Sequence, residues 1–447
     1  MNKREFFRTS GALITGGVWS HLMGSETAAT PRTNWSGNYQ YHAEHLYAPR
    51  TAADVCKLVK NSNRAKALGK RHSFDGIADT TGVQISLENL TEMSIDDKSR
   101  TVTVGAGVSY GTLSPYLYKN GYALHNLASL PHISVAGARS TATHGSGIKN
   151  GNLATVVSGL ELVTADGELV ELSRERNHDH FSGAVVDLGA LGVVTKLRLD
   201  LLPKFDVSQV VYENVPMEKL ERHLDEIFSS GYSVSLFTDW QQHRITQAWI
   251  KRRVESGESS KIPKDFFGGK LATRNLHPLT GHSAENCTEQ MGIPGPWYER
   301  LPHFRMNFTP SSGQELQTEY FVPRDRAYEA ILAVERLRNE ITPHLFITEL
   351  RTIDADELWM SPCYQRASLT IHFTWKPEWT AVKAVLPKIE EALAPFDARP
   401  HWAKLFTMQP ARLQSQYAKL SDFKSLVRHY DPRGKFRNEF LTSNLFT

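Results

Sequence analysis

The segment formed by residues 128–147 constrains the fold more than any other part of the chain. It reads ASLPHISVAGARSTATHGSG, in which small residues, hydroxyls and glycines predominate. Such a composition lets the backbone approach a pyrophosphate closely and offers hydroxyl groups to its oxygens. A flexible loop is the ordinary alternative, but the apolar side chains of Leu130, Ile133 and Val135 indicate a packed segment. We therefore expect an ordered phosphate-binding segment here.

A second segment, ALGKRHSF at 67–74, has the same character. It reads as a strand that ends at Gly69, where a glycine lets the backbone turn and present N–H groups to an anion. His72 would face a group bound at that turn, although a lone histidine is more often a hydrogen-bonded structural residue. The Gly-Ser-Gly at 145–147 lacks the third glycine and the following helix of a dinucleotide fingerprint, which excludes a nicotinamide-binding Rossmann fold.

Length and charge narrow the class of protein further. A chain of 447 residues allows more than one core, so two domains are expected. The formal net charge is +3, from 51 basic and 48 acidic residues that are interleaved, so we expect no nucleic-acid partner.

Cys56, Cys287 and Cys363 show no CxxC spacing and allow at most one disulfide. The His-Asp-His triplet at 178–180 lacks further ligands, so no metal site is expected.

The first residues have the pattern of an export signal. Lys3 and Arg4 precede a weakly apolar run at 11–23, and small residues at 27–29 offer a cleavage site. The sequence KREFFR resembles a twin-arginine signal, with lysine where the first arginine is usual. A Sec signal and an uncleaved membrane-surface helix are the alternatives. We expect residues 1–30 to direct export to the periplasm or medium, without stable membrane insertion, because the apolar run is too short to span a bilayer.

The rest of the chain alternates short strands with amphipathic helices. Before Pro203 the patterns predict helices over 51–59 and 109–118, strands over 65–69, 101–108 and 189–202, and a hairpin over 159–172 with Asp166-Gly167 as its turn. After Pro203 they predict strands over 207–215, 234–240, 317–321, 345–351 and 368–375, helices over 218–228, 324–340 and 379–393, and a loop-rich stretch over 257–302. This order predicts a second, α+β domain built on one sheet.

Together these segments resemble the FAD-binding domain of the vanillyl-alcohol oxidase superfamily, and the chain is most similar to the alditol and xylitol oxidases. The resemblance runs from about Asn34 to the C-terminus. Its most specific motifs are GxRHSF at 69–74, ASLPHISVAG at 128–137, THGSG at 143–147, GALGVV at 189–194 and DPxGKF at 431–436. It implies an α+β fold with a two-part FAD-binding domain of the vanillyl-alcohol oxidase type, at 31–205 and 406–447, and an α+β substrate (cap) domain at 206–405.

The resemblance also implies a covalent cofactor. His72 stands where the family carries FAD on an 8α-histidyl bond, which prevents flavin loss and raises the flavin reduction potential. The alditol oxidases often have glycine directly before this histidine, where this chain has Arg71. The other FAD contacts that the resemblance implies are Leu68, Gly69, Lys70, Arg71, Ser73, Ser129, Ser134, Gly137, Thr141, Ala142, Thr143, His144, Val193 and His401.

The candidate catalytic residues lie in the second domain. Glu349 and Arg351 share one face of a predicted strand, and His372 and Thr374 share a face of another. An acid and a base so spaced usually form a solvated or cross-strand pair. The resemblance instead places Glu349 and Arg351 against polyol hydroxyls and matches Lys404 to the family's proposed base. It implies a catalytic set of Lys404, Arg351, His372 and Glu349, and a substrate-binding set of Ser129, Glu349, Arg351 and Thr374.

These residue types suit the oxidation of an alcohol. A lysine whose pKa is depressed by burial and by Arg351 can accept the hydroxyl proton, and Arg351 and His372 can stabilise the developing alkoxide. Glu349 and Ser129 would orient the hydroxyls, because a polyol offers neither charge nor ring for recognition. The implied reaction converts the terminal primary alcohol of a xylitol- or sorbitol-like alditol to an aldose and reduces dioxygen to hydrogen peroxide, in a monomer.

Three alternatives stay open. A polyol dehydrogenase would pass electrons to a quinone or cytochrome, and Ala128 bears on it because related flavoenzymes use a small residue there to gate oxygen. Alanine occurs at that position in oxidases and dehydrogenases alike. The second alternative is an aldonolactone oxidase. The third is a non-catalytic polyol- or flavin-binding protein, against which the presence of Lys404, Arg351 and His372 together argues.

Overall fold

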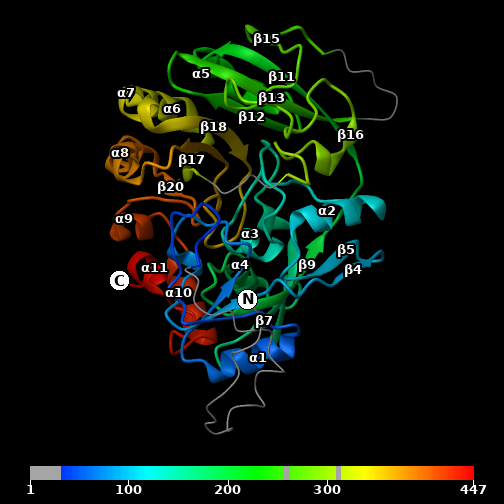
Figure 1. The fold of residues 1–447 in the computed structure, drawn as a ribbon, viewed down its shortest axis with the longest axis vertical. Coiled ribbons are helices and arrows are strands. Elements are labelled where there is room, and N and C mark those ends of the chain that lie inside the picture. The colour runs from blue at the N-terminus through cyan, green and yellow to red at the C-terminus, as the bar shows by residue number, and fades with distance from the viewer. Residues whose placement is uncertain (1–31, 255–261, 309–313) are drawn as a thin grey trace, which may run out of the picture.

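The computed structural model describes residues 32–254, 262–308 and 314–447, and the chain forms two stacked bodies, each with its own hydrophobic core (Figure 1). The lower body comprises residues 32–205 and 401–447, and the upper body residues 206–400. The predicted export signal at 1–30 lies outside the described residues. No helix in those ranges has both the length and the apolar character needed to cross a membrane. Cys56, Cys287 and Cys363 are all free thiols.

The lower body contains two main sheets. The parallel sheet has the order β1-β3-β2, and the antiparallel sheet the order β4-β5-β9-β7-β8. Apolar residues alternate along the long strand β9, as a half-buried strand requires, and the predicted hairpin is the pair β7 and β8. The strands are β1 (His45–Tyr47), β2 (Ala65–Leu68), β3 (Val83–Ser86), β4 (Met93–Asp96), β5 (Thr101–Gly105), β7 (Val157–Val163), β8 (Leu169–Ser173) and β9 (Val193–Asp200), with β6 (Tyr122–Ala123) and β10 (Leu202–Pro203) forming a separate pair.

Side-chain caps fix where the helices of the lower body begin. Thr51, Ser109 and Ser134 each accept a backbone N–H in the first turn of a helix, which satisfies a donor that has no partner inside the helix. The helices are α1 (Ala52–Asn61), α2 (Tyr110–Lys119), α3 (Val135–Ser140) and α4 (His178–Val185). The short helix α3 lies inside the segment expected to bind phosphate, and its sequence pattern did not predict it.

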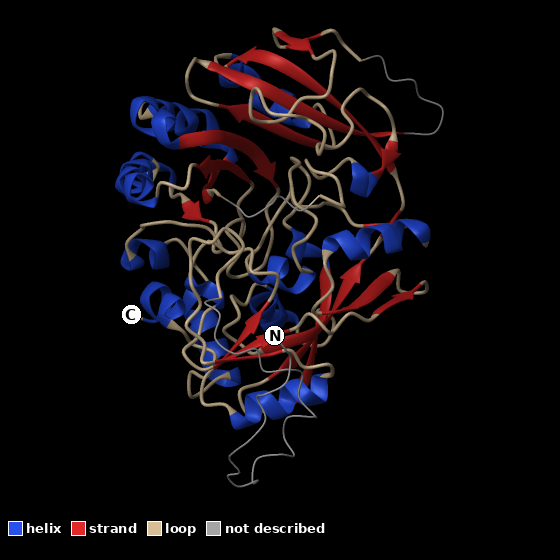
Figure 2. Ribbon diagram, viewed as in Figure 1, coloured by secondary structure: helices blue, strands red, loops and turns tan. Residues whose placement is uncertain are grey.

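The upper body is built on one ten-stranded sheet, as the sequence predicted (Figure 2). Its order is β14-β15-β11-β13-β12-β18-β19-β17-β20, with β16 paired to β11. The strands are β11 (Asp206–Pro216), β12 (Ser233–Thr238), β13 (Arg244–Val254), β14 (Asp265–Phe266), β15 (Gly269–Leu271), β16 (Gly295–Pro296), β17 (Leu316–Pro323), β18 (Leu345–Ile353), β19 (Ser368–Trp375) and β20 (Arg399–Pro400).

The two faces of this sheet are covered differently. Helices α5 (Lys219–Ser229), α6 (Ala327–Glu335), α7 (Arg338–Ile341) and α8 (Trp379–Ala392) supply the apolar side chains that pack on one face. On the other face a small cluster that includes Phe237 and Trp249 packs against residues of the loop at 272–304. Because side chains alternate along a strand, the residues of β18 that face away from the helices include Glu349 and Arg351.

After the upper body the chain returns to the lower one. Helices α9 (Pro410–Ser415), α10 (Leu420–Tyr430) and α11 (Glu439–Leu441) add Phe423, Val427 and Leu441 to the first core. Figure 1 shows these red helices beside the blue N-terminal elements. The backbone N–H of Ala65 donates to the carbonyl of Lys435, so strand β2 is tied directly to the returning segment.

Candidate active site

A deep cavity runs between the two bodies. Most of its wall comes from loops of the lower body, and one end is closed by the upper sheet and by the segment at 401–404. The lining includes residues 66–74, 128–130, 133–134, 136–141 and 143–144, and Leu188, Gly189, Gly192, Val194, Gln317, Glu319, Arg351, His372, His401, Ala403 and Lys404. The cavity therefore joins the segments expected to bind FAD to the residues expected to act on the substrate.

The wall of the lower body is shaped for close backbone approach. A Cβ atom on Gly69 would lie 2.8 Å from Oγ of Ser134, and one on Gly137 would lie 2.9 Å from the same oxygen. Ser134 itself caps helix α3 by accepting the N–H of Gly137 at 3.3 Å. Both glycines are thus needed for the turn after β2 to pack against α3, which leaves small residues and N–H groups facing the cavity. This wall fits a pyrophosphate and supports FAD as the occupant.

His72 lies on this wall beside two aromatic side chains. The ring centroids of Trp35 and His72 are 4.5 Å apart, and Nε2 of His132 lies 3.2 Å from Nδ1 of His72. Burial, reinforced by His132 and Lys404, lowers the pKa of His72 to about 3. Arg71, immediately before it, adopts a left-handed backbone with φ of 61°, a conformation that glycine adopts without steric cost.

The register of the upper sheet places the polar residues of the site in one row. Glu319 of β17 pairs with His372 of β19, which pairs in turn with Glu349 of β18. In the neighbouring row Arg351 lies opposite Thr370. Cross-strand neighbours of this kind have Cβ atoms within about 5.5 Å of each other, so three strands bring two acids and a histidine together on one face.

Glu319 is the centre of the charge cluster. Nζ of Lys404 lies 2.6 Å from Oε2 of Glu319, and an Arg351 guanidinium nitrogen lies 2.8 Å from Oε1. His144 approaches the same Oε1 at 3.2 Å from the lower body. Burial opposes ionisation of Glu319, but Lys404, His144 and Arg351 outweigh it and hold its pKa well below the usual value. Burial, with Arg351, lowers the pKa of Lys404, although Glu319 raises it.

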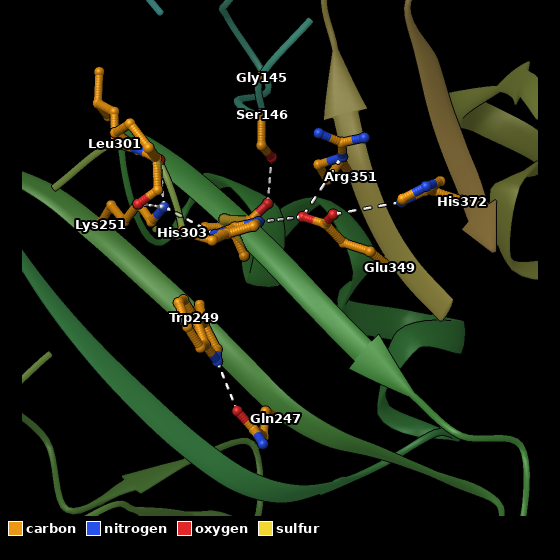
Figure 3. A network of polar contacts seen from close by, with 12 residues as sticks. Gly145, Ser146, Gln247, Trp249, Lys251, Leu301, His303, Glu349, Arg351 and His372 are labelled. Carbon is orange, nitrogen blue, oxygen red and sulfur yellow. Dashed lines mark hydrogen bonds and ion pairs between the residues drawn. The ribbon is translucent and has the colours of Figure 1, made fainter. Parts of the chain in front are cut away.

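Glu349 forms a second charged centre behind the first (Figure 3). Its Oε1 accepts from Nε2 of His303 at 2.7 Å and lies 3.6 Å from Nε of Arg351. Its Oε2 lies 3.7 Å from Nδ1 of His372. Burial raises the pKa of Glu349, yet Arg351 and His303 overcome this and the net shift is strongly downward. The pKa of His372 falls to about 4 through burial and Lys404, so this ring is neutral, and its buried Nε2 has no partner within the described chain.

One group within the described residues has the spacing of metal ligands. Atoms of His144, Glu319 and His401 all lie within 4.8 Å of one another. However, Lys404 and Arg351 already bring positive charge to Glu319, and a further cation would be repelled there. We therefore assign the three residues to the cavity that holds FAD.

Comparisons with known proteins agree with this geometry. A model of an FAD-binding domain matches residues 43–173, and a model of D-arabinono-1,4-lactone oxidase matches residues 309–444. An alditol oxidase from a Streptomyces species is 47% identical over 92% of this chain and 98% of its own length. The chain belongs to the alditol oxidase family. As a member of that family it is an FAD-dependent oxidoreductase.

More distant relatives of this alditol oxidase family protein share the whole architecture. An L-gulonolactone oxidase from Mus musculus is 26% identical over 91% of this chain and 96% of its own length. A cholesterol oxidase from B. sterolicum superposes with a TM-score of 0.78 at 14% identity, covering 98% of this chain and all of its own, which shows the shared fold alone. The predicted fold class, with an FAD-binding domain of the vanillyl-alcohol oxidase type, is confirmed.

The structure brings most of the predicted site residues of this alditol oxidase family member to the cavity. Thirteen of the fifteen predicted FAD contacts line it: Leu68, Gly69, Lys70, Arg71, His72, Ser73, Ser129, Ser134, Gly137, Thr141, Thr143, His144 and His401. Ala142 and Val193 do not. Val193 is fully buried in the first core, and its neighbours Gly192 and Val194 line the cavity instead, because alternate side chains of a strand face opposite ways.

Some of the predicted catalytic and substrate-binding residues line the cavity, and others do not. Lys404, Arg351 and His372 line the cavity, whereas Glu349 contacts Arg351 and His372 from behind and is not part of the lining. Thr374 pairs with Gln317 across β17 and β19, but only Gln317 reaches the wall. Gln317 and Glu319 were not predicted. They lie two residues apart on one face of β17, and an amide and an acid at that spacing in an otherwise mainly apolar strand are a usable signal.

Proposed function

We propose that the enzyme oxidises the terminal primary alcohol of an alditol, a xylitol- or sorbitol-like polyol, to the aldose and reduces dioxygen to hydrogen peroxide. The observation that carries this proposal is the position of Lys404. This buried amine, with its lowered pKa, lies at the end of the cavity beside Arg351 and His372. The high identity to an alditol oxidase supports the same substrate class.

The side chains at this end can divide the work of alcohol oxidation. FAD held along the cavity wall of the lower body would supply the acceptor for the hydride of the alcohol carbon and the route of the electrons to dioxygen. Lys404, as the neutral amine, accepts the hydroxyl proton on Nζ. Arg351 supplies hydrogen bonds to the oxygen as negative charge develops there. Nδ1 of His372 faces the carboxylate of Glu349, so the unpartnered Nε2 of this neutral ring accepts from a substrate hydroxyl. Gln317 and Ser129 offer further polar groups to the other hydroxyls.

We propose further that His72 holds the flavin covalently through an 8α-histidyl bond. Its lowered pKa supports this, because a neutral imidazole keeps a nitrogen lone pair free to form the bond. Its position on the cavity wall, next to the turn after Gly69, supports the same proposal.

The decisive experiment is anaerobic mixing of the purified enzyme with a panel of alditols and aldonolactones while the flavin absorbance near ~450 nm is followed, a wavelength general to oxidised flavins. Bleaching by alditols, with rapid recovery and peroxide formation in air, is the expected result. Recovery only with a quinone or dye would show a dehydrogenase. Bleaching by lactones alone would show that the substrate is an aldonolactone. If no polyol bleached the flavin, the proposed alditol oxidation would be rejected.

We also propose that the enzyme acts as a monomer in the periplasm or medium, directed there by residues 1–30. The basic residues, apolar run and small residues of that segment support export. Fractionation of cells, N-terminal sequencing of the exported protein and its mass in solution test this together. Enzyme confined to the cytoplasm with an intact N-terminus would contradict it.

A further inference from the structure

Lys251 is a buried lysine that does not line the cavity. It lies on β13 and is only 1% exposed. Its Nζ donates to the carbonyl oxygens of Leu301 and Pro302, the latter at 3.4 Å, and lies 3.3 Å from Nδ1 of His303 (Figure 3). An ammonium group has three N–H donors and no acceptor. The three neighbours use all three donors, so Nδ1 of His303 must accept.

This contact determines where the proton of His303 lies. With Nδ1 as acceptor, the neutral ring carries its proton on Nε2, which donates to Oε1 of Glu349 at 2.7 Å. Burial lowers the pKa of His303, although Glu349 raises it, and the ring is neutral. Phe237 and Trp249 pack edge-on against the ring, with centroids 5.5 Å and 5.2 Å away, so its orientation is fixed as well.

Glu349 is therefore held from two sides. His303 reaches one oxygen from the loop at 272–304 (the covering loop), while Arg351 and His372, both on the cavity wall, contact the carboxylate from the site. Along the chain of contacts from Lys251 through Glu349 and Arg351 to Glu319, positive and negative groups alternate. Loss of the lysine would allow the other tautomer of His303, which presents a lone pair to the carboxylate and repels it.

We propose that Lys251 and His303 are positioning residues: the lysine fixes the tautomer of the histidine, and the histidine fixes the carboxylate of Glu349, which in turn orients Arg351 and His372 toward the polyol. This inference rests on the proposed function, because it assigns the pair a part in binding the polyol. The reaction itself needs no step through either residue, so their effect is expected in substrate affinity more than in turnover.

The contact between Lys251 and His303 should make the binding of the polyol depend on pH. Burial, opposed by Glu349, lowers the pKa of Lys251 to about 7. The titratable and charged groups around the pair are Glu349 and Arg351 on β18 and Cys287 on the covering loop. Below that pKa the ammonium keeps Nδ1 as acceptor, and above it the amine allows either tautomer. KM for the polyol should therefore rise as pH increases through about 7 in the wild type.

The test uses three variants of the holoenzyme. His303→Leu removes the bond to Glu349, and KM should rise by about tenfold or more with kcat changed by less than about threefold, as expected for one hydrogen bond to a charged group. His303→Gln keeps an N–H donor near the same place and should recover most of the loss. Lys251→Met should raise KM at low pH and abolish its rise through neutral pH. His277→Leu, on the same loop but without contact to Glu349, is the matched control and should leave KM unchanged.

A double variant separates positioning from a merely structural role. Adding His303→Leu to Glu349→Gln should change KM little further, because the histidine acts through that carboxylate. An equal effect in both backgrounds, or no effect of His303→Leu on KM, would overturn the inference while polyol oxidation by the wild type stands. If His303→Leu loses its flavin, Lys251→Met decides, and an unchanged pH dependence of KM in that variant overturns the inference. A wild type that oxidises no polyol would remove the proposed function first.

Discussion

Lys404 and Glu319 form the shortest charged contact of the cavity wall, with Nζ 2.6 Å from Oε2. The carboxylate is fully buried and is shared with Arg351. The proton affinity of the candidate base is therefore a balance: burial and Arg351 favour the neutral amine, and Glu319 favours the ammonium. Glu319 and Arg351, both on the upper sheet, thus set the pH at which Lys404 can accept a proton.

Replacing Lys404 by methionine should slow flavin reduction by the polyol roughly 10²–10⁴-fold, the usual contribution of a general base. The measurement is anaerobic stopped-flow reduction, with flavin content compared before mixing. Lys388→Met is the control, because Lys388 is an exposed lysine paired with Glu340 far from the cavity. A Lys404→Met enzyme reduced as fast as the wild type would show that the proton leaves by another route.

Replacing Glu319 by glutamine should move the pH dependence of flavin reduction. The rate rises with pH as Lys404 loses its proton, and loss of the carboxylate lowers the pKa of that amine further. The rising limb should therefore shift to lower pH. In Arg351→Gln the opposite charge is removed, so the limb should shift to higher pH. Shifts in the same direction in both variants would contradict this balance.

The same Glu319→Gln variant should be less stable. It leaves Arg351 and Lys404 buried without their shared partner, and breaking a buried pair costs about 3–5 kcal/mol. Thermal unfolding of the holoenzyme should show a clearly lower midpoint than the exposed-site control Glu340→Gln. Equal midpoints would mean that water replaces the lost carboxylate.

Replacing His72 by alanine tests the covalent bond. Acid precipitation of the wild type should leave the yellow colour in the pellet, and the variant should release it to the supernatant. His132→Ala, which removes the neighbouring ring but leaves His72, should keep the flavin attached. Colour released from the wild type itself would reject the bond.

Replacing Arg71 tests the left-handed turn before His72. Glycine adopts a φ of 61° without steric cost, so Arg71→Gly should match or exceed the wild type in thermal midpoint. Arg71→Val should lower the midpoint, since a β-branched residue is strained there. Differential scanning calorimetry of both holoenzymes is the measurement, and a midpoint lower for glycine than for valine would contradict it.

The elements with a regular pattern of apolar and polar residues are the ones that the sequence predicts correctly. Strand β19 was predicted with its observed bounds, Ser368–Trp375, because apolar and polar residues alternate along it. Strand β13 was missed, because its buried Lys251 and Gln247 belong to polar networks and break that pattern. The predicted helix over 324–340 is two helices, α6 and α7, and the short helix α3 was hidden by a glycine in its middle.

Site residues in continuous motifs were predicted, whereas site residues whose partners lie far apart in the sequence were missed. Motifs in continuous segments, such as those around His72 and His144, were found from sequence because neighbouring residues share one task. Glu319 was missed because its partners, His144, Arg351 and Lys404, come from three distant segments. His303 was missed because it directly follows the loop-rich stretch over 257–302 and belongs to no predicted strand, so no periodicity indicates that its side chain points inward. Contacts of this kind exist only after the two bodies have formed.

The return of the chain to the lower body also sets an order of events during synthesis. Strand β2, which leads to His72, is bonded to Lys435, and Lys66 on that strand donates to the carbonyl of Phe436. Helices α10 and α11 complete the core beneath it. A ribosome that has made residues 32–205 has therefore made only part of the flavin pocket, and must translate the whole upper body before the remainder emerges. Cofactor capture is thereby postponed to a nearly finished polypeptide, and a transcript truncated before codon 431 should yield colourless protein.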